Sequence, residues 1–149
     1  MVRLGDDHVF PSPRSANRHG VVAYGGDLHP NRIIEAYKNG IFPWFESDDN
    51  LMWWSPDPRM ILYPNKIKIS KSLNSFIKKT PLKITFNKDF EEVIESCSNI
   101  KRLGQKGTWI TKGLKESFIK LHEKGLAISV EVLSLIHISE PTRLRRISY

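Results

Sequence analysis

This sequence of 149 residues lacks the cysteines of a disulfide framework and the long apolar runs of a membrane protein. With only one cysteine, Cys97, it cannot form an intramolecular disulfide framework, and such cysteine usage fits a reducing cytosol. It contains no run approaching the roughly 18 consecutive apolar residues that a membrane span needs. Its N-terminus, MVRLGDDHVFPSP, lacks the apolar stretch of a signal peptide. We therefore predict a cytoplasmic protein without a membrane anchor.

Metal and cofactor motifs are also absent from the sequence. The five histidines do not have the i, i+4 spacing of a helical zinc site around a glutamate, and one cysteine cannot build a thiolate zinc site. No glycine-rich phosphate loop, dinucleotide fingerprint or nucleophile elbow occurs. We therefore expect no metal and no cofactor, and any chemistry must begin from a substrate that is already activated.

Acidic residues are scarce in one long segment of a basic chain. The formal charge of +7 and the pI near 9.6 favour an anionic partner such as nucleic acid. Between residues 66 and 88 there are seven lysines and no aspartate or glutamate. Lys71 and Lys78 fall opposite the apolar stripe of a predicted helix, as a phosphate-contacting surface requires. A solvated lysine-rich surface explains this composition equally well.

Periodicity and capping signals predict alternating helices and strands. Pro30 suits the first turn of a helix that ends at Gly40, and Ser70 and Thr111 can cap two further helices, the second running to about residue 124. A helix over residues 88–97 places Cys97 on its buried face. Strands are expected at residues 21–24, 60–64, 82–86 and 127–132. This order favours a mixed α/β or α+β domain, and we predict the α+β class.

The segment from Ile41 to Arg59, IFPWFESDDNLMWWSPDPR, holds three of the four tryptophans. If Trp53 and Trp54 lie in an extended segment, their side chains point to opposite faces, so a single core cannot take both. The segment has four acidic residues and Arg59 as its only base, which does not suit a phosphate backbone. Core packing is the ordinary explanation for its phenylalanines. Its tryptophans instead suggest walls around a terminal base, an apolar side chain or a cationic ligand.

Several motifs, taken in order, resemble the leucyl/phenylalanyl-tRNA:protein transferase family. They are GGDL (25–28), NGIFPWF (39–45), WWSPDPR (53–59), ISKSL (69–73) and GTWIT (107–111). HEKGLAISVEV (122–132) also resembles the family's HExGHAHSVEV, with Leu126 and Ile128 in place of its two later histidines. The resemblance covers about residues 10–132, and the pair of tryptophan motifs is far more specific than any single short motif.

The resemblance implies a small N-terminal domain over residues 1–64. An acetyltransferase-like (GNAT-like) mixed-sheet domain would begin at residue 65 and be truncated at residue 132. The following sequence, LSLIHISEPTR, resembles the in-frame translation of a transposase adaptor used in preparing DNA libraries. We interpret residues 133–149 as a non-native tail from cloning or assembly. The alternative is a natural divergent tail.

The activity implied by the resemblance is transfer of leucine, phenylalanine or, less often, methionine from aminoacyl-tRNA to the N-terminal arginine or lysine of an acceptor protein, which marks that protein for degradation. An aminoacyl ester is already activated, so the reaction requires no cofactor. The complete protein is expected to be a monomer. The resemblance places the family's proton-transfer groups in the missing half, so the catalytic residues stay unassigned here, and we expect this fragment to be inactive alone.

The resemblance also implies substrate-binding residues. It assigns Trp44 and Trp109 to the 3′-terminal adenosine and the aminoacyl end. The full predicted substrate-binding set is Trp44, Trp53, Trp54, Arg59 and Trp109. The predicted tRNA-binding set is Lys66, Lys68, Lys71, Lys78, Lys79 and Lys83. We further hypothesise that Glu46, Asp48 and Asp49 attract the cationic N-terminus of the acceptor. The alternative function is a non-catalytic tRNA- or RNA-binding module.

Overall fold

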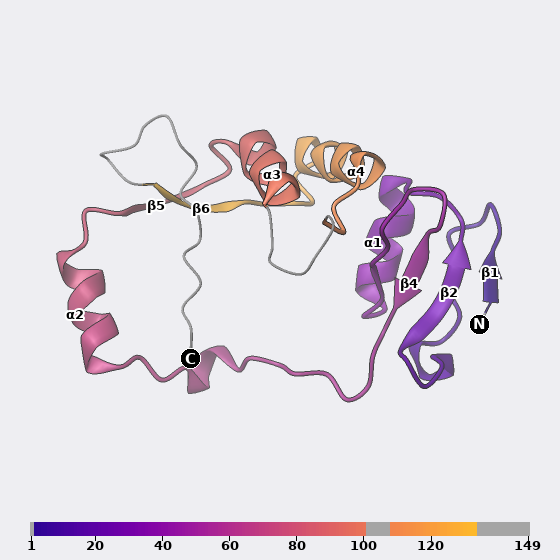
Figure 1. Cartoon of the computed structure of the whole chain (residues 1–149), viewed down its shortest axis with the longest axis horizontal. Coiled ribbons are helices and arrows are strands. Elements are labelled where there is room, and N and C mark those ends of the chain that lie inside the picture. The colour runs from indigo at the N-terminus through magenta and orange to yellow at the C-terminus, as the bar shows by residue number, and fades with distance from the viewer. Residues whose placement is uncertain (1, 101–107, 134–149) are drawn as a thin grey trace.

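The computed structural model describes residues 2–100 and 108–133, and within them the chain is a mixture of helices and short strands (Figure 1). This confirms the predicted α+β class, whereas the acetyltransferase-like assignment and the domain boundaries stay predictions. The strands are β1 (Val2–Leu4), β2 (Val21–Gly25), β3 (Phe42–Pro43), β4 (Met52–Trp54), β5 (Lys83–Phe86) and β6 (Val130–Leu133). The helices are α1 (Pro30–Lys38), α2 (Lys71–Lys79), α3 (Phe90–Asn99) and α4 (Lys112–Glu123), with 3-10 turns η1 (Pro13–Ser15) and η2 (Pro64–Lys66).

The first four strands form one sheet in the order β1-β2-β4-β3. β1 runs parallel to β2, while β4 pairs antiparallel with both β2 and β3. Strands β3 and β4 make a hairpin in which Phe42 lies opposite Trp54 and Pro43 lies opposite Trp53. The tryptophan-rich segment therefore contains a sheet hairpin, and Trp53 and Trp54 meet the condition of lying in an extended segment.

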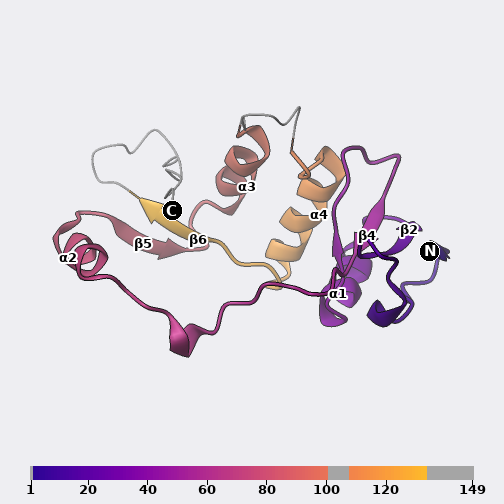
Figure 2. The same cartoon turned by 60° about the horizontal axis from the view of Figure 1, so that its bottom comes forward.

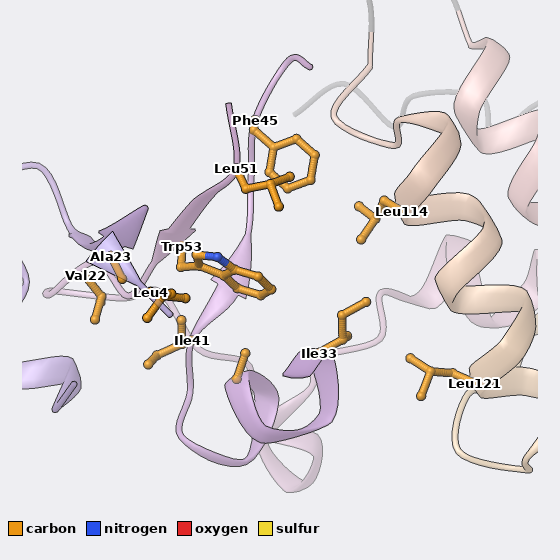
Figure 3. Close-up of a cluster of buried hydrophobic side chains, with 11 residues drawn as sticks. Leu4, Val22, Ala23, Ile33, Ile41, Phe45, Leu51, Trp53, Leu114 and Leu121 are labelled. Atoms are coloured by element: carbon orange, nitrogen blue, oxygen red, sulfur yellow. The ribbon is translucent and has the colours of Figure 1, made fainter. Parts of the chain in front are cut away.

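Trp53 lies in the middle of the core between this sheet and the helices α1 and α4. Its side chain is 0% exposed, and its indole N–H donates to the carbonyl oxygen of Gly25 at 3.0 Å. Figure 3 shows the labelled apolar side chains of the sheet and of the residues that flank β3 and β4 around Trp53, with Ile33 of α1 and two leucines of α4 facing them. The buried cluster is Leu4, Val22, Ala23, Ile33, Ala36, Ile41, Phe45, Leu51, Trp53, Leu114 and Leu121.

Local capping chemistry fixes the helix ends where the sequence predicted them. Pro30 is the first residue of α1, and Gly40, just after its end, has a φ of +70°, a conformation that glycine adopts without steric cost. The Ser70 hydroxyl accepts from the Leu73 amide at the start of α2, and Thr111 caps α4 in the same way. The helix starts predicted from these residues are confirmed.

A second, two-stranded sheet lies beside α3 and α4. β5 and β6 pair antiparallel, which confirms the strands predicted near 82–86 and 127–132. Helix α3 lies next to α4, and the ring of Phe90 stacks on that of His122 with centroids 4.1 Å apart. The predicted inner face of α3 is buried or half-buried, and Cys97 on this face is half-buried.

The strand predicted at 60–64 is wrong. Residues 60–63 belong to no strand, Met60 is 98% exposed, and η2 begins at Pro64. A strand requires a neighbour to accept and donate its backbone hydrogen bonds, and within the described ranges none is paired with this segment. Figure 1 shows why, since the chain after β4 runs along the bottom of the view, away from both sheets, until it reaches α2.

Helix α2 has the predicted apolar stripe, but the stripe is not buried. Phe76 is 58% exposed, and Leu73 and Ile77 are exposed as well. The apolar side chains of Ile84 and Phe86 on β5 are likewise exposed. Both figures of the whole chain place α2 at the far end from the first sheet (Figures 1 and 2). Residues 60–86 thus form an arm with uncovered apolar surface.

Glu131 on β6 ties the second sheet to the start of α3. Burial alone would raise the pKa of its carboxyl group, but hydrogen bonds from Ser129, Thr85 and the backbone amides of Asp89 and Lys88 lower this pKa to about 2. A carboxylate that accepts several hydrogen bonds is stabilised in its charged form. Glu131 therefore links β5, β6 and the residues before α3 as an anion.

We predict that Trp53→Ala lowers the free energy of unfolding by about 3–5 kcal/mol or removes the cooperative transition, because it leaves a cavity at the centre of the core. Trp44→Ala, at a residue that is 52% exposed, should change it by less than about 1 kcal/mol. Urea unfolding followed by far-ultraviolet circular dichroism measures both. Equal losses for the two variants would contradict the assignment of Trp53 to the core.

We predict that the stability difference between the wild type and Glu131→Gln depends on pH. Because the pKa of folded Glu131 is about 2, below the ordinary value of 4.5, its stabilisation is fully present above pH 4.5 and is lost as the pH falls toward 2. Urea unfolding between pH 7 and pH 2.5 should show the difference shrinking over that window. Glu123→Gln, at an exposed position on α4, is the control. A difference that stays constant down to pH 2.5 would contradict the prediction.

Candidate substrate-binding site

The outer face of the β3–β4 hairpin carries a small aromatic cluster. Trp44 is about half exposed, and its ring lies 5.3 Å from that of half-buried Trp54, tilted by 54°. The Trp54 indole N–H donates to the carbonyl oxygen of Trp44 at 2.7 Å. Arg59 places its guanidinium 5.2 Å from the centre of the Phe42 ring and donates to the Gly40 carbonyl oxygen at 3.1 Å. These side chains form the aromatic surface that we call the hairpin site: Phe42, Trp44, Trp54 and Arg59.

Strand alternation explains which aromatic residues are available to a ligand. In β4 neighbouring side chains point to opposite faces, so burial of Trp53 places Trp54 on the outer face. Trp53, although predicted as a substrate-binding residue, presents no exposed surface in this structure. Its position lets it support the hairpin from inside the core.

Trp109 lies just before α4 and is half-buried against the core. Two residues later Thr111 caps α4, and its hydroxyl donates to a carboxylate oxygen of Asp48 at the tip of the hairpin. The other carboxylate oxygen of Asp48 accepts from the Gly113 amide at 2.9 Å. The segments that carry Trp44 and Trp109, far apart in the sequence, are therefore joined through Asp48.

This arrangement gives Asp48 a partner that the sequence did not reveal. The hypothesis that Glu46, Asp48 and Asp49 together attract a cationic acceptor treated all three as free, but Asp48 is engaged with α4 and Asp49 bonds to the hydroxyl of Ser47. No periodicity or motif links Asp48 to Thr111, because a contact between residues 63 positions apart depends on the tertiary fold.

The predicted tRNA-binding lysines are all exposed but do not adjoin the hairpin site. Those of α2 lie at the opposite end of the molecule from β4 and α1 (Figure 1). Lys66 belongs to η2, where its ammonium lies 5.0 Å from the centre of the Tyr63 ring. Lys83 is on β5, and Lys68 lies between η2 and α2. The structure thus separates an aromatic site from a lysine-bearing arm.

Neither a metal centre nor a membrane helix occurs in the described parts of the chain. No group of three or more His, Cys, Asp or Glu side chains within residues 2–100 and 108–133 could hold a metal ion. In the same ranges no helix has the length and apolar character needed to cross a membrane. A hollow of about 490 Å³ beside α1 is lined by His8, Phe10, Ile34 and Leu126, among others, and includes none of the predicted site residues.

Two family models match this chain. The model described as leucyl/phenylalanyl-tRNA protein transferase matches residues 61–136, and that of the N-terminal domain of the same transferase matches residues 26–57. The first match ends four residues beyond Val132, where the sequence resemblance was expected to stop. Apart from Leu133 in β6, the predicted non-native tail at 133–149 lies outside the described residues.

Curated relatives carry the same name. The chain is 48% identical over 132 residues to the leucyl/phenylalanyl-tRNA-protein transferase of Christiangramia forsetii, an alignment covering 89% of this chain and 62% of that protein. It is 51% identical over 129 residues to the protein of that name from Flavobacterium psychrophilum, covering 87% and 61%. For the Escherichia fergusonii protein the identity is 48% over 135 residues, covering 89% and 56%.

Fold and site together define an α+β protein that presents tryptophans on the outer face of a sheet hairpin and carries lysines on a separate arm. The matches show which family it belongs to. The chain belongs to the leucyl/phenylalanyl-tRNA protein transferase family. It spans about 60% of the length of the curated relatives that it matches.

Proposed function

We propose that this chain is part of an enzyme that moves leucine, phenylalanine or, less often, methionine from aminoacyl-tRNA to the N-terminal arginine or lysine of an acceptor protein. The observation that carries the proposal is the exposed tryptophan surface of the hairpin site in a chain of this family. The reaction takes place in the cytoplasm and marks the acceptor for degradation.

In this proposal Trp44 and Trp109 hold the 3′-terminal adenosine and the aminoacyl end of the tRNA. Trp54 and Arg59 complete the wall on the hairpin, and Trp53 fixes the hairpin from the core. Flat aromatic rings suit a terminal base because stacking contributes about 1–3 kcal/mol per base. The lysines of the arm contact phosphates of the acceptor stem.

The chemistry requires no cofactor. The neutral α-amine of the acceptor attacks the carbonyl carbon of the aminoacyl ester, a peptide bond forms, and the ester C–O bond breaks. The proton of the amine ends on the departing ribose oxygen. Binding and orientation supply most of the catalysis for such an activated ester, with help for proton transfer. No catalytic residue is assigned among the residues of this chain.

We also propose that the 149 residues alone do not catalyse transfer. The arm exposes apolar side chains of α2 and β5 that would be buried in a complete core. Exposed apolar surface and unpaired strand edges favour aggregation. The curated relatives are longer, which supports the same proposal. Leucine transfer to an N-terminal arginine peptide by this chain alone would contradict it.

We predict that Trp44→Ala weakens binding of 3′-phenylalanylamino-3′-deoxyadenosine, an amide analogue of the aminoacyl end, by roughly 5- to 150-fold through loss of stacking. Isothermal titration calorimetry measures the affinity without relying on tryptophan emission. The matched control is Tyr63→Ala, since Tyr63 is a comparably exposed aromatic residue (53%) on the arm. Equal affinities for the wild type and Trp44→Ala would contradict the assignment of Trp44 to the adenosine.

The second candidate function is a non-catalytic tRNA- or RNA-binding module, favoured by the exposed lysines of the arm. For either function we predict that replacing Lys71, Lys78 and Lys79 together by glutamine weakens tRNA binding. The negative slope of log K against log salt should become shallower by about 2–3, because fewer counterions are released on binding when three phosphate contacts are lost. The control replaces Lys38, Lys120 and Lys124, which are exposed on or beside α1 and α4.

Two measurements separate these functions. Steep salt dependence with any RNA, together with no affinity for the aminoacyl-adenosine analogue, would favour the module. Salt-insensitive binding of the analogue would favour the transferase pocket. An unchanged slope in the triple lysine variant would contradict the role of the arm in both.

A further inference from the structure

The tip of the β3–β4 hairpin is tied to the first turn of α4 by one side chain. The two carboxylate oxygens of Asp48 are used separately, one by the Thr111 hydroxyl and the other by the Gly113 amide at 2.9 Å. The Thr111 oxygen also accepts from the Leu114 amide at 3.4 Å, so the same hydroxyl caps the helix and binds the hairpin. A carboxylate is favourable here because the amino end of a helix carries a partial positive charge.

The hairpin approaches the helix at a glycine. A Cβ atom at position 113 would lie 2.9 Å from a carboxylate oxygen of Asp48, closer than real Cβ contacts, and 3.0 Å from a methyl carbon of Leu28, a tight contact, so the Asp48 side chain would have to shift. Gly113 is the second residue of α4, so the hairpin contacts the helix in its first turn.

The connection limits how far apart two tryptophans can be. Trp44 is four residues before Asp48, and Trp109 is two residues before Thr111. Four residues of extended chain span at most about 14 Å and two at most about 7 Å. Further along the helix, Leu114 and Leu121 are buried in the core and the Ser117 hydroxyl donates to the carbonyl oxygen of Leu28. These contacts hold the body of α4, while Asp48 holds the turn next to Trp109.

We propose that Asp48 is a positioning residue that sets the distance between the segments carrying Trp44 and Trp109. This inference rests on the proposed function, in which both tryptophans bind the aminoacyl-adenosine end. Asp48 does not touch the ligand; it fixes the hairpin relative to α4 so that both rings are in place before binding. Preorganisation of this kind raises affinity because less ordering remains to be done when the ligand binds.

The test compares six variants of the 149-residue chain with the same amide analogue in calorimetry. Asp48→Ala removes both acceptor oxygens, and Thr111→Val removes the hydroxyl while keeping the shape of the side chain. Asp49→Ala is the matched control, because Asp49 is in the same turn and bonds to Ser47. Thr111→Ser, which keeps the hydroxyl, is the control for Thr111→Val.

Asp48→Ala and Thr111→Val should each weaken binding roughly tenfold, because each removes the charge-assisted hydrogen bond between the Thr111 hydroxyl and Asp48. Asp49→Ala and Thr111→Ser should bind as the wild type does. The affinity of Asp48→Asn should lie between those of the wild type and Asp48→Ala, since its amide oxygen still accepts one hydrogen bond. The double variant of Asp48→Ala and Thr111→Val should be no weaker than either single one, because both remove the same connection.

Hydrogen exchange followed by mass spectrometry measures, without any ligand, how strongly Asp48 protects the hairpin tip and the start of α4. Exchange of peptides containing residues 46–50 and 111–114 should rise in Asp48→Ala and stay unchanged in Asp49→Ala, with α1 unaffected in both. A helix that merely loses stability would instead exchange faster along its whole length.

The outcomes separate this inference from the proposed function. If the wild type binds the analogue and Asp48→Ala binds it equally well, the positioning role is overturned and the transferase proposal stands. If the wild type does not bind the analogue, the proposed pocket fails and the role of Asp48 in it fails too. Unchanged exchange at residues 111–114 in Asp48→Ala would overturn the connection itself.

Discussion

Burial of the Trp53 indole is the interaction on which the rest of the described structure depends. Its ring fills the space between the four-stranded sheet and the helices α1 and α4, and its N–H is satisfied by the Gly25 carbonyl oxygen of the neighbouring strand. A side chain of this size contributes a large apolar area, and its polar atom requires a partner once it is buried. The sheet, α1 and α4 therefore share one core even though α4 lies far along the chain.

The same burial creates the exposed aromatic surface. Because neighbouring side chains in a strand alternate, fixing Trp53 inward turns Trp54 outward, where its indole N–H is satisfied by the Trp44 carbonyl oxygen. The hairpin is thus rigid at its aromatic end and anchored at its tip by Asp48. The exposed surface of Trp44 is therefore supported both from the core and from α4.

The arm over residues 60–86 contributes no residue to this core. Its helix forms because Ser70 caps it and its residues favour helix, but its apolar stripe has no cover among the described residues. The chain spans about 60% of the length of its curated relatives, and amphipathic helices in proteins gain most of their stability from packing. The lysines of the arm therefore lie on a part of the molecule that exposes apolar side chains of α2 and β5.

The sequence by itself determined the helix starts and the alternation of the neighbouring tryptophans. Pro30, Ser70 and Thr111 mark helix starts through hydrogen bonds and sterics that act within a few residues, and these local effects survive in the fold. Only the tertiary structure decided that Trp53 is the buried member of its pair, that residues 60–64 find no strand partner, and that Asp48 binds α4. Burial and long-range pairing depend on which surfaces meet, and no local pattern in the sequence contains that information.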